Sequence, residues 1–175
     1  MGGMATTQDH PATTPRLGRY EIDAGRSAVT FRTRHLFGLA PVRGSFAIRG
    51  GTVDIAEPLA DSVIHAEIDT ASFRTGNAQR DASVLAQRVL DPEHHPIITF
   101  DSERPGPRDI PGTLTVLGVT RAVRLRVTEL TEAPGSFTVR ATARIDRTEF
   151  GVTAYRGLAG RYLDMSVEVQ CIPAS

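Results

Sequence analysis

The chain of 175 residues has no tryptophan and no lysine, and it contains a single cysteine, Cys171. One cysteine excludes an internal disulfide and a metal site built from cysteines. Cys171 lies in an alternating run of apolar residues, so we interpret it as a small buried hydrophobic residue. Because lysine is absent, all 20 basic residues are arginine. We interpret this as a compositional bias and not as a sign of phosphate binding.

Net charge and long apolar runs are also missing. The 20 basic residues balance 20 acidic residues, which gives no reason to expect nucleic acid or an anionic membrane surface as a partner. No apolar run approaches the roughly 20 residues of a membrane helix, so we expect no membrane span. The polar segment 1–17 does not have the pattern of a secretory signal peptide. We therefore expect a cytoplasmic protein with a disordered tail over 1–17 and a single domain over 18–173.

Motifs of the common enzyme classes do not occur in the sequence. There is no G-x-S-x-G elbow, P-loop, G-x-G-x-x-G or H-E-x-x-H. His65, Glu67, His94 and His95 are residue types that bind metals, but their spacings match no familiar site. We therefore expect no catalytic residues, no metal and no cofactor.

The chain does have a regular alternation of apolar and polar residues, which is typical of half-buried β-strands. Between the first strands, Gly50-Gly51 predicts a turn. Many short strands joined by Gly and Pro turns predict a mainly β fold, as an antiparallel barrel or a sandwich. Residues expected to face inward on two of these strands are Val123, Leu125, Val127, Leu163, Met165, Val167 and Val169.

One stretch, 75–100, departs from this alternation. Ala78, Ala82, Leu85 and Val89 follow a helical period and predict one apolar helix face. Thr75 is the expected N-cap, and Asp91-Pro92 is expected to end the helix. Two interpretations stay open: a lid or plug at one end of the β structure, or a connector that covers an open sheet edge.

Four short motifs follow one another along the chain. They are Tyr20-x-Ile22-Asp23 with Ser27-x-Val29-x-Phe31 and His35; Gly44-x-Phe46 with Gly51; Thr75-Gly76 through Arg80-Asp81 to Leu90-Asp91 and then Pro96-x-Ile98-x-Phe100; and Gly112-x-Leu114-Thr115-x-x-Gly118-Val119-Thr120 with the segment 146–151. In this order and spacing they resemble the YceI-like family of lipid-binding β-barrels, over about residues 18–172.

The resemblance implies a fold, a ligand and an assembly. The fold is an extended, lipocalin-like antiparallel β-barrel of about eight strands with a helical lid. The ligand is a long apolar molecule in the lumen, such as an isoprenoid or fatty-acyl chain, and the assembly is a homodimer. A barrel of eight strands is just wide enough to be filled by side chains or to hold one small ligand.

Small inward residues favour a lumen that holds a ligand, because Ala141 and Ala143 would leave room in it. Alternatively, aromatic side chains such as Phe31, Phe46 and Phe137 would fill it. We expect the ligand to contact eleven residues: Phe31, His35, Phe46, Arg80, Asp81, Leu85, Phe100, Ala141, Ala143, Met165 and Val167.

Polar residues near the lumen allow several roles. His35 either contacts a ligand headgroup or is a hydrogen-bonded structural residue. Arg80-Asp81 either forms a headgroup site, or Asp81 pairs with Arg147 and fixes the helix to the barrel. The function we predict is non-catalytic binding, transport or storage of an amphiphilic lipid. The alternatives are a lipid-modifying enzyme that uses His35 and Asp81, and a structural or interaction module with a filled lumen.

Overall fold

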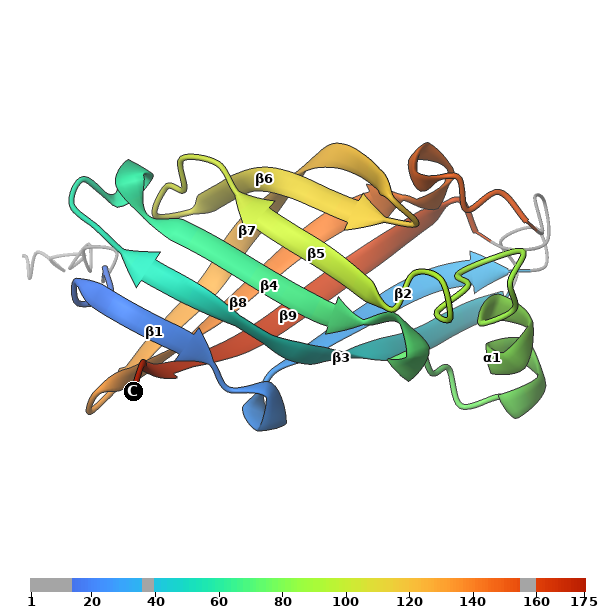
Figure 1. Cartoon of the computed structure of the whole chain (residues 1–175), viewed down its shortest axis with the longest axis horizontal. Coiled ribbons are helices and arrows are strands. Elements are labelled where there is room, and N and C mark those ends of the chain that lie inside the picture. Colours follow the sequence, from blue (N-terminus) through green and yellow to red (C-terminus); the bar gives the residue numbers. More distant parts are fainter. Residues whose placement is uncertain (1–13, 36–39, 155–159) are drawn as a thin grey trace, which may run out of the picture.

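The protein is an antiparallel β-barrel (Figure 1). The computed structural model describes residues 14–35, 40–154 and 160–175, and of His35 only the backbone. The strands are β1 (Gly18–Ile22), β2 (Ala28–His35), β3 (Ala40–Ile55), β4 (Val63–Asp69), β5 (Ile97–Ser102), β6 (Asp109–Val116), β7 (Val119–Ala133), β8 (Ser136–Asp146) and β9 (Tyr162–Pro173). The helices are α1 (Ala78–Val84) and the short 3₁₀ turns η1 (Ala24–Arg26), η2 (Leu59–Asp61), η3 (Thr70–Ser72) and η4 (Arg147–Phe150).

Nine strands close a ring of eight positions. The hydrogen-bonded order is β3-β2-β9-β8-β7-β6-β5-β4, and pairing of β4 with β3 closes the ring. The short strand β1 pairs with β3 and with β9 beyond the end of β2. Strands β1 and β2 therefore share one position in the ring, one after the other. This confirms the predicted barrel of about eight strands and removes the sandwich alternative.

The predicted turn at Gly50-Gly51 is wrong, because β3 continues through both glycines. The register between β3 and β4 shifts between Ile48 and Gly50, which marks a bulge that bends the strand. A Cβ atom at Gly51 would lie 2.9 Å from Cα of Ala66, so only glycine permits this close approach of the two strands. The glycines thus bend one long strand and do not separate two short ones.

The seven residues expected to face inward do so, since all of them line the interior of the barrel. Strand β7 keeps its apolar side inward past Val127 through a second bulge. The register with β8 shifts between Val127 and Glu129, and the hydroxyl of Thr128 donates to the Arg140 carbonyl at 3.2 Å. Leu130 then returns to the interior.

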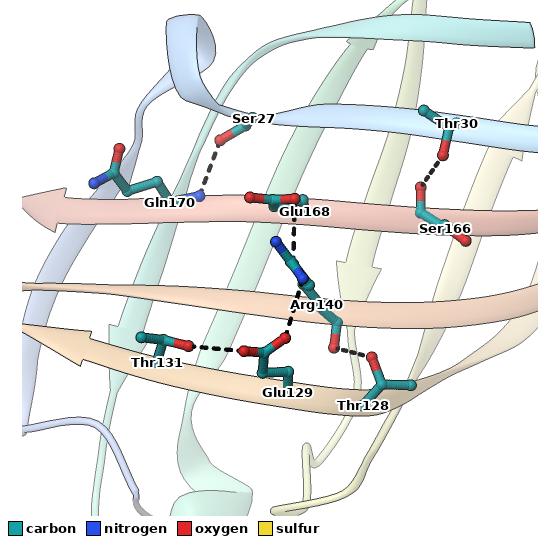
Figure 2. A network of polar contacts seen from close by, with 9 residues as sticks. All are labelled: Ser27, Thr30, Thr128, Glu129, Thr131, Arg140, Ser166, Glu168 and Gln170. Carbon is teal, nitrogen blue, oxygen red and sulfur yellow. Dashed lines mark hydrogen bonds and ion pairs between the residues drawn. The ribbon is translucent and has the colours of Figure 1, made fainter.

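The outer face of β7, β8 and β9 is polar (Figure 2). Arg140 on β8 lies between two carboxylates, 3.1 Å from Glu129 on β7 and 3.3 Å from Glu168 on β9. All three side chains are about half exposed, so these ion pairs contribute little to stability. They do show which face of the sheet is solvated, and so which face is left for the lumen.

The predicted helix is shorter than its pattern suggested. Helix α1 begins after Asn77, whose side chain accepts from the Arg80 amide, and it ends at Val84. The expected N-cap, Thr75, lies outside the helix, and the expected apolar face is wrong because Ala78 and Ala82 are exposed. The chain reverses in tight turns after Val84, and Leu90 donates back to the Val84 carbonyl at 3.0 Å.

Apolar residues of this segment still cover one end of the barrel. Val84, Leu85, Val89 and Leu90 pack with Phe31 and Phe73 in one cluster of the core. A backbone bridge between Arg74 and Ser45 holds the segment to β3, with bonds of 2.8 and 3.1 Å. The position therefore favours the lid interpretation over a connector along an open edge, since the closed ring leaves β3 paired on both sides.

Candidate functional site

The lumen contains two cavities of about 200 Å³ each. Cavity A occupies the end of the barrel near β1 and the turn after β5, where Thr14, Pro15 and Pro105 line it. Its wall includes Ala141, Ala143 and Val167 from β8 and β9, which are three of the predicted contact residues. Among the described residues, none that lines cavity A carries a charge. Cavity A can therefore enclose only an apolar group without leaving a buried charge unpaired.

Cavity B lies toward α1, at the other end of the barrel. Three aromatic rings form part of its wall: Phe31 and Phe73 are stacked with centroids 5.5 Å apart, and Phe46 lies 5.4 Å from Phe73. These are distances at which aromatic pairs attract one another. The rings pack on the wall beside the cavity and leave it open, so the alternative of a lumen filled by aromatic side chains does not hold here.

The two cavities share part of their lining. The shared residues are Val29, Ile68, Leu114, Ile145 and Met165. Each comes from a different strand, so the two cavities adjoin at a ring of five apolar side chains. Met165 is the one long, flexible side chain of this ring, and methionine adapts its shape to neighbours more readily than branched residues do.

Two glycines in the wall make room for aromatic rings. Gly44 on β3 is paired with Phe31 on β2, and a Cβ atom at Gly44 would overlap the Phe31 ring. Similarly, a Cβ atom at Gly112 on β6 would lie 2.7 Å from Cζ of Phe100 on β5. In both places the ring packs against bare backbone, which leaves lumen volume that the ring would otherwise take.

Three arginines line cavity B at the end covered by α1: Arg34, Arg80 and Arg147. They come from the end of β2, from α1 and from η4, which lie at one end of the barrel in Figure 1. Among the described residues, no Asp or Glu lines either cavity. The wall of cavity B is nevertheless almost entirely apolar, so the arginines line it mainly with the aliphatic parts of their side chains.

Hydrogen bonds orient two of these guanidinium groups. Arg80 donates from Nε to the Thr75 hydroxyl at 2.7 Å and from Nη2 to the Thr75 carbonyl at 3.2 Å. Arg147 donates from Nε to the Gly160 carbonyl at 2.7 Å and from Nη1 to the carbonyls of Val152 and Ala154 at 2.7 and 2.8 Å. These contacts fix the orientation of both guanidinium groups, and the Thr75 hydroxyl that accepts from Arg80 also donates to the Asp81 carboxylate.

Asp81 is joined to Arg80 through the Thr75 hydroxyl. Its carboxylate accepts from the Thr75 amide at 3.0 Å and from the Thr75 hydroxyl at 2.5 Å, and it does not line either cavity. Among the described residues, Asp81 has these partners and not the ion pair with Arg147 that was one of the two alternatives. Of the pair, only Arg80 lines cavity B, and Asp81 holds the segment that precedes the helix.

The other predicted contact residues divide into three groups. Phe31, Phe46, Phe100 and Met165 line the cavities. Leu85 instead packs in the cluster beneath the helical segment and lines neither cavity. The side chain of His35 lies outside the described residues. No ligand contact of any of these residues is tested by their placement, so the contacts remain predictions.

Several lining residues escaped the sequence analysis. Phe73, Arg34 and Arg147 all line cavity B. Arg34 follows Thr33, so alternation would direct it to the outer face, but it is the last described side chain of its strand. Phe73 and Arg147 belong to short turns after a strand, where a period of two no longer predicts direction. Arg147 falls in the motif segment 146–151, but nothing in the sequence marked it or Phe73 as lining the lumen.

Cys171 is a further group in the wall of cavity A. Its side chain is 1% exposed, and burial raises the pKa of the Cys171 thiol to about 12. A thiol reacts as the thiolate, so the folded protein should react slowly with alkylating agents at neutral pH.

The described histidine side chains form no further site. On the outer face, Nδ1 of His65 lies 2.6 Å from Asp101, and this hydrogen bond raises the pKa of His65. His94 contacts Asp91 at 3.0 Å, and that hydrogen bond raises the pKa of His94. Within the described parts of the chain, no group of three or more His, Cys, Asp or Glu is placed to hold a metal ion. No helix of those parts is long and apolar enough to cross a membrane.

Comparison with known proteins agrees with this architecture. The family model described as a YceI-like domain matches residues 20–171. The chain belongs to the YceI-like family. A YceI-like relative, protein YceI of Escherichia coli O157:H7, is 30% identical over 164 residues, which cover 86% of this chain and 85% of the relative.

Two solved structures have the same fold. BcnA of Burkholderia cenocepacia matches with a TM-score of 0.72 and 21% identity, over 85% of this chain and 98% of BcnA. A polyisoprenoid binding domain from Saccharophagus degradans matches with a TM-score of 0.70 and 14% identity, over 91% of this chain and all of that domain. At these identities the likeness establishes the YceI-like barrel, and the ligand has to be argued from this chain.

Proposed function

We propose that the protein is a non-catalytic carrier or store for an amphiphilic lipid, whose isoprenoid or fatty-acyl chain lies in the lumen. The observation that supports this most directly is the pair of cavities that share five apolar lining residues. Together they reach the lower part of the range of about 300–1,000 Å³ that is usual for ligand pockets. The resemblance to a solved polyisoprenoid binding domain gives independent support.

Burial of the chain supplies the affinity in this proposal. Each methylene removed from water contributes roughly 0.8 kcal/mol. Ten or more methylenes would then contribute on the order of 8 kcal/mol, which offsets the cost of ordering a flexible chain and of association. A lumen without charge at one end favours such a chain over a polar ligand, because no polar group there would find a partner.

The alternative functions have less support from the described residues. An acid–base pair of His35 and Asp81 would need the Asp81 carboxylate in the cavity, whereas that carboxylate is bound to Thr75 and lines neither cavity. A structural module with a filled lumen would not have two cavities of this size. We also propose that the protein forms a homodimer. Sedimentation at high protein concentration measures the oligomeric state and tests this.

Native mass spectrometry of freshly purified protein tests the proposal. We expect adducts with the mass of a lipid, and the same lipid in an organic extract. Delipidated protein should take up palmitic acid or geranylgeraniol in a ratio of one per barrel. Protein that carries no lipid after purification and takes up neither compound would contradict a carrier function.

Cys171 provides a second, internal measurement of occupancy. Because burial raises the pKa of Cys171 to about 12, we expect iodoacetamide to alkylate it slowly at pH 8 and faster as the pH rises toward that value. A chain in cavity A should slow the reaction further, and intact mass gives the extent of alkylation. Equal rates with and without bound lipid would place the chain outside cavity A.

A further inference from the structure

We propose that Met165 determines how long a chain the protein binds. Its side chain lines both cavities, and a chain longer than one cavity reaches the second only when this side chain turns aside. A short chain occupies one cavity and leaves Met165 in place. This inference rests on the proposed function and adds a selection by chain length to it.

Met165 lies where the two cavities and the two clusters of the core meet. It is one of the five residues that line both cavities. Of these five, it is the one that packs against both clusters, the cluster that contains Ile22 and Val53 and the cluster that contains Phe31 and Phe73. A side chain in this position borders each cavity, so its conformation decides whether the two are continuous.

The size of the cavities makes this border important. Each cavity has a volume of about 200 Å³, which is below the range of about 300–1,000 Å³ that is usual for ligand pockets. Only the two together reach that range. A long chain therefore has to occupy both cavities and pass the five shared lining residues, whereas a short chain fits in one of them.

Met165 can move more easily than the other shared lining residues. Its side chain is unbranched and has three rotatable bonds. The other four are branched, and Val29, Ile68 and Ile145 are branched at Cβ, which restricts their rotamers. Val29 is also only 3% exposed and Ile145 9% exposed, so their neighbours hold them in place. Met165 is half-buried although it points inward, which leaves part of its surface facing the cavities.

The strand neighbours of Met165 determine the direction of this movement. In register, Met165 pairs with Phe31 on β2 and with Ala143 on β8. The Phe31 ring is held in place, because it packs on the backbone of Gly44 and stacks on Phe73 with centroids 5.5 Å apart. Ala143 has only a methyl group and lines cavity A. The Met165 side chain therefore has room to turn over Ala143, away from Phe31.

Chains of two lengths measure the selection. We would determine the affinities of decanoic and palmitic acid, and of geraniol and geranylgeraniol, by isothermal titration. In the parent protein each added methylene should raise the affinity by up to about fourfold, so the longer chain of each pair binds more tightly. In Met165→Phe, whose rigid ring cannot fold back, the ratio of long-chain to short-chain affinity should fall about fiftyfold, which corresponds to about three methylenes kept out of the second cavity.

Further variants keep the test informative if Met165→Phe folds poorly. Met165→Ile is branched at Cβ and should lower the same ratio by a smaller factor. Met165→Ala removes the border and should keep the preference for the longer chain. The matched control is Ser166→Phe, because Ser166 is the next residue of β9, is exposed and lines neither cavity. We expect it to bind all four compounds as the parent does, and circular dichroism checks the fold of each variant.

The outcomes distinguish selection by Met165 from the carrier function. If the parent binds the long chains and Met165→Phe and Met165→Ile keep its ratio, Met165 does not select chain length, while the carrier function stands. A loss by the same factor for short and long chains would show that Met165 only fills part of one common lumen, and it would also overturn the selection. If the parent binds none of the four compounds, the carrier function itself fails.

Discussion

Replacing Ala141 by phenylalanine should abolish the binding of long chains while the barrel still folds. Ala141 is 4% exposed on β8, and it lines cavity A between Val127 and Val167 of the neighbouring strands. A ring there would occupy space that the proposed chain needs. Displacing about four methylenes at roughly 0.8 kcal/mol each would lower the affinity by about two orders of magnitude. Isothermal titration with palmitic acid measures the effect, and circular dichroism checks the fold.

The matched control for this change is the next residue of the strand. Thr142 is exposed on the outer face, so Thr142→Phe adds the same ring to the other side of the wall. We expect it to bind palmitic acid as the parent does. Ala143→Phe should behave like Ala141→Phe, because Ala143 also lines cavity A. Undiminished binding in both inward variants would place the ligand outside the barrel.

Replacing Gly44 by valine should destabilise the protein by roughly 2–3 kcal/mol, because overpacking of a tight site forces backbone and ring to move. A Cβ atom at Gly44 would overlap the Phe31 ring and lie 2.7 Å from the Arg74 carbonyl oxygen. The loss runs against the usual preference of strands for valine over glycine. Urea unfolding measures it as a lower midpoint with an unchanged slope.

A second variant tests the cause of this loss. In Gly44→Val with Phe31→Leu, the smaller side chain makes room for the valine, so we expect the double variant to lose less than the sum of the two single losses. Ala47→Val is the matched control, since Ala47 is exposed on the same strand and its change should stay within about 0.5 kcal/mol. Additive losses in the double variant would mean that the ring is not the obstacle.

The sequence predicted the wall of the barrel well, because a period of two relates directly to the two faces of a strand. It placed Val167 and Val169 inward, and they line cavity A. The prediction failed where the conformation of a glycine depends on packing against a neighbouring strand and not on the local sequence. Gly50-Gly51 has the composition of a turn, but close packing against β4 keeps β3 continuous through it.

The α1 end of the lumen was the least predictable part. Arg80 was a candidate because it falls in a motif of the family, and it does line cavity B. Arg147 was considered only as a partner for Asp81. Its role depends on where the chain returns after η4, which is set by hydrogen bonds to Val152, Ala154 and Gly160. Since every basic residue of the chain is arginine, composition could not single out Arg34, Arg80 and Arg147.

The division of one ring position between β1 and β2 has a consequence for local unfolding. Strand β2 pairs with β3 over residues 28–35 and with β9 over residues 28–32, so the ring there stays closed if β1 alone detaches. Strand β1 is held by four pairs with β3 and three with β9, and its Ile22 lines cavity A. Detachment of this strand would uncover the neutral end of the lumen without breaking the rest of the barrel. Amide exchange at Tyr20 and Ile22 that is faster than in β9 would reveal such an opening, and it would give the apolar tail of a lipid a route of exit opposite the arginines.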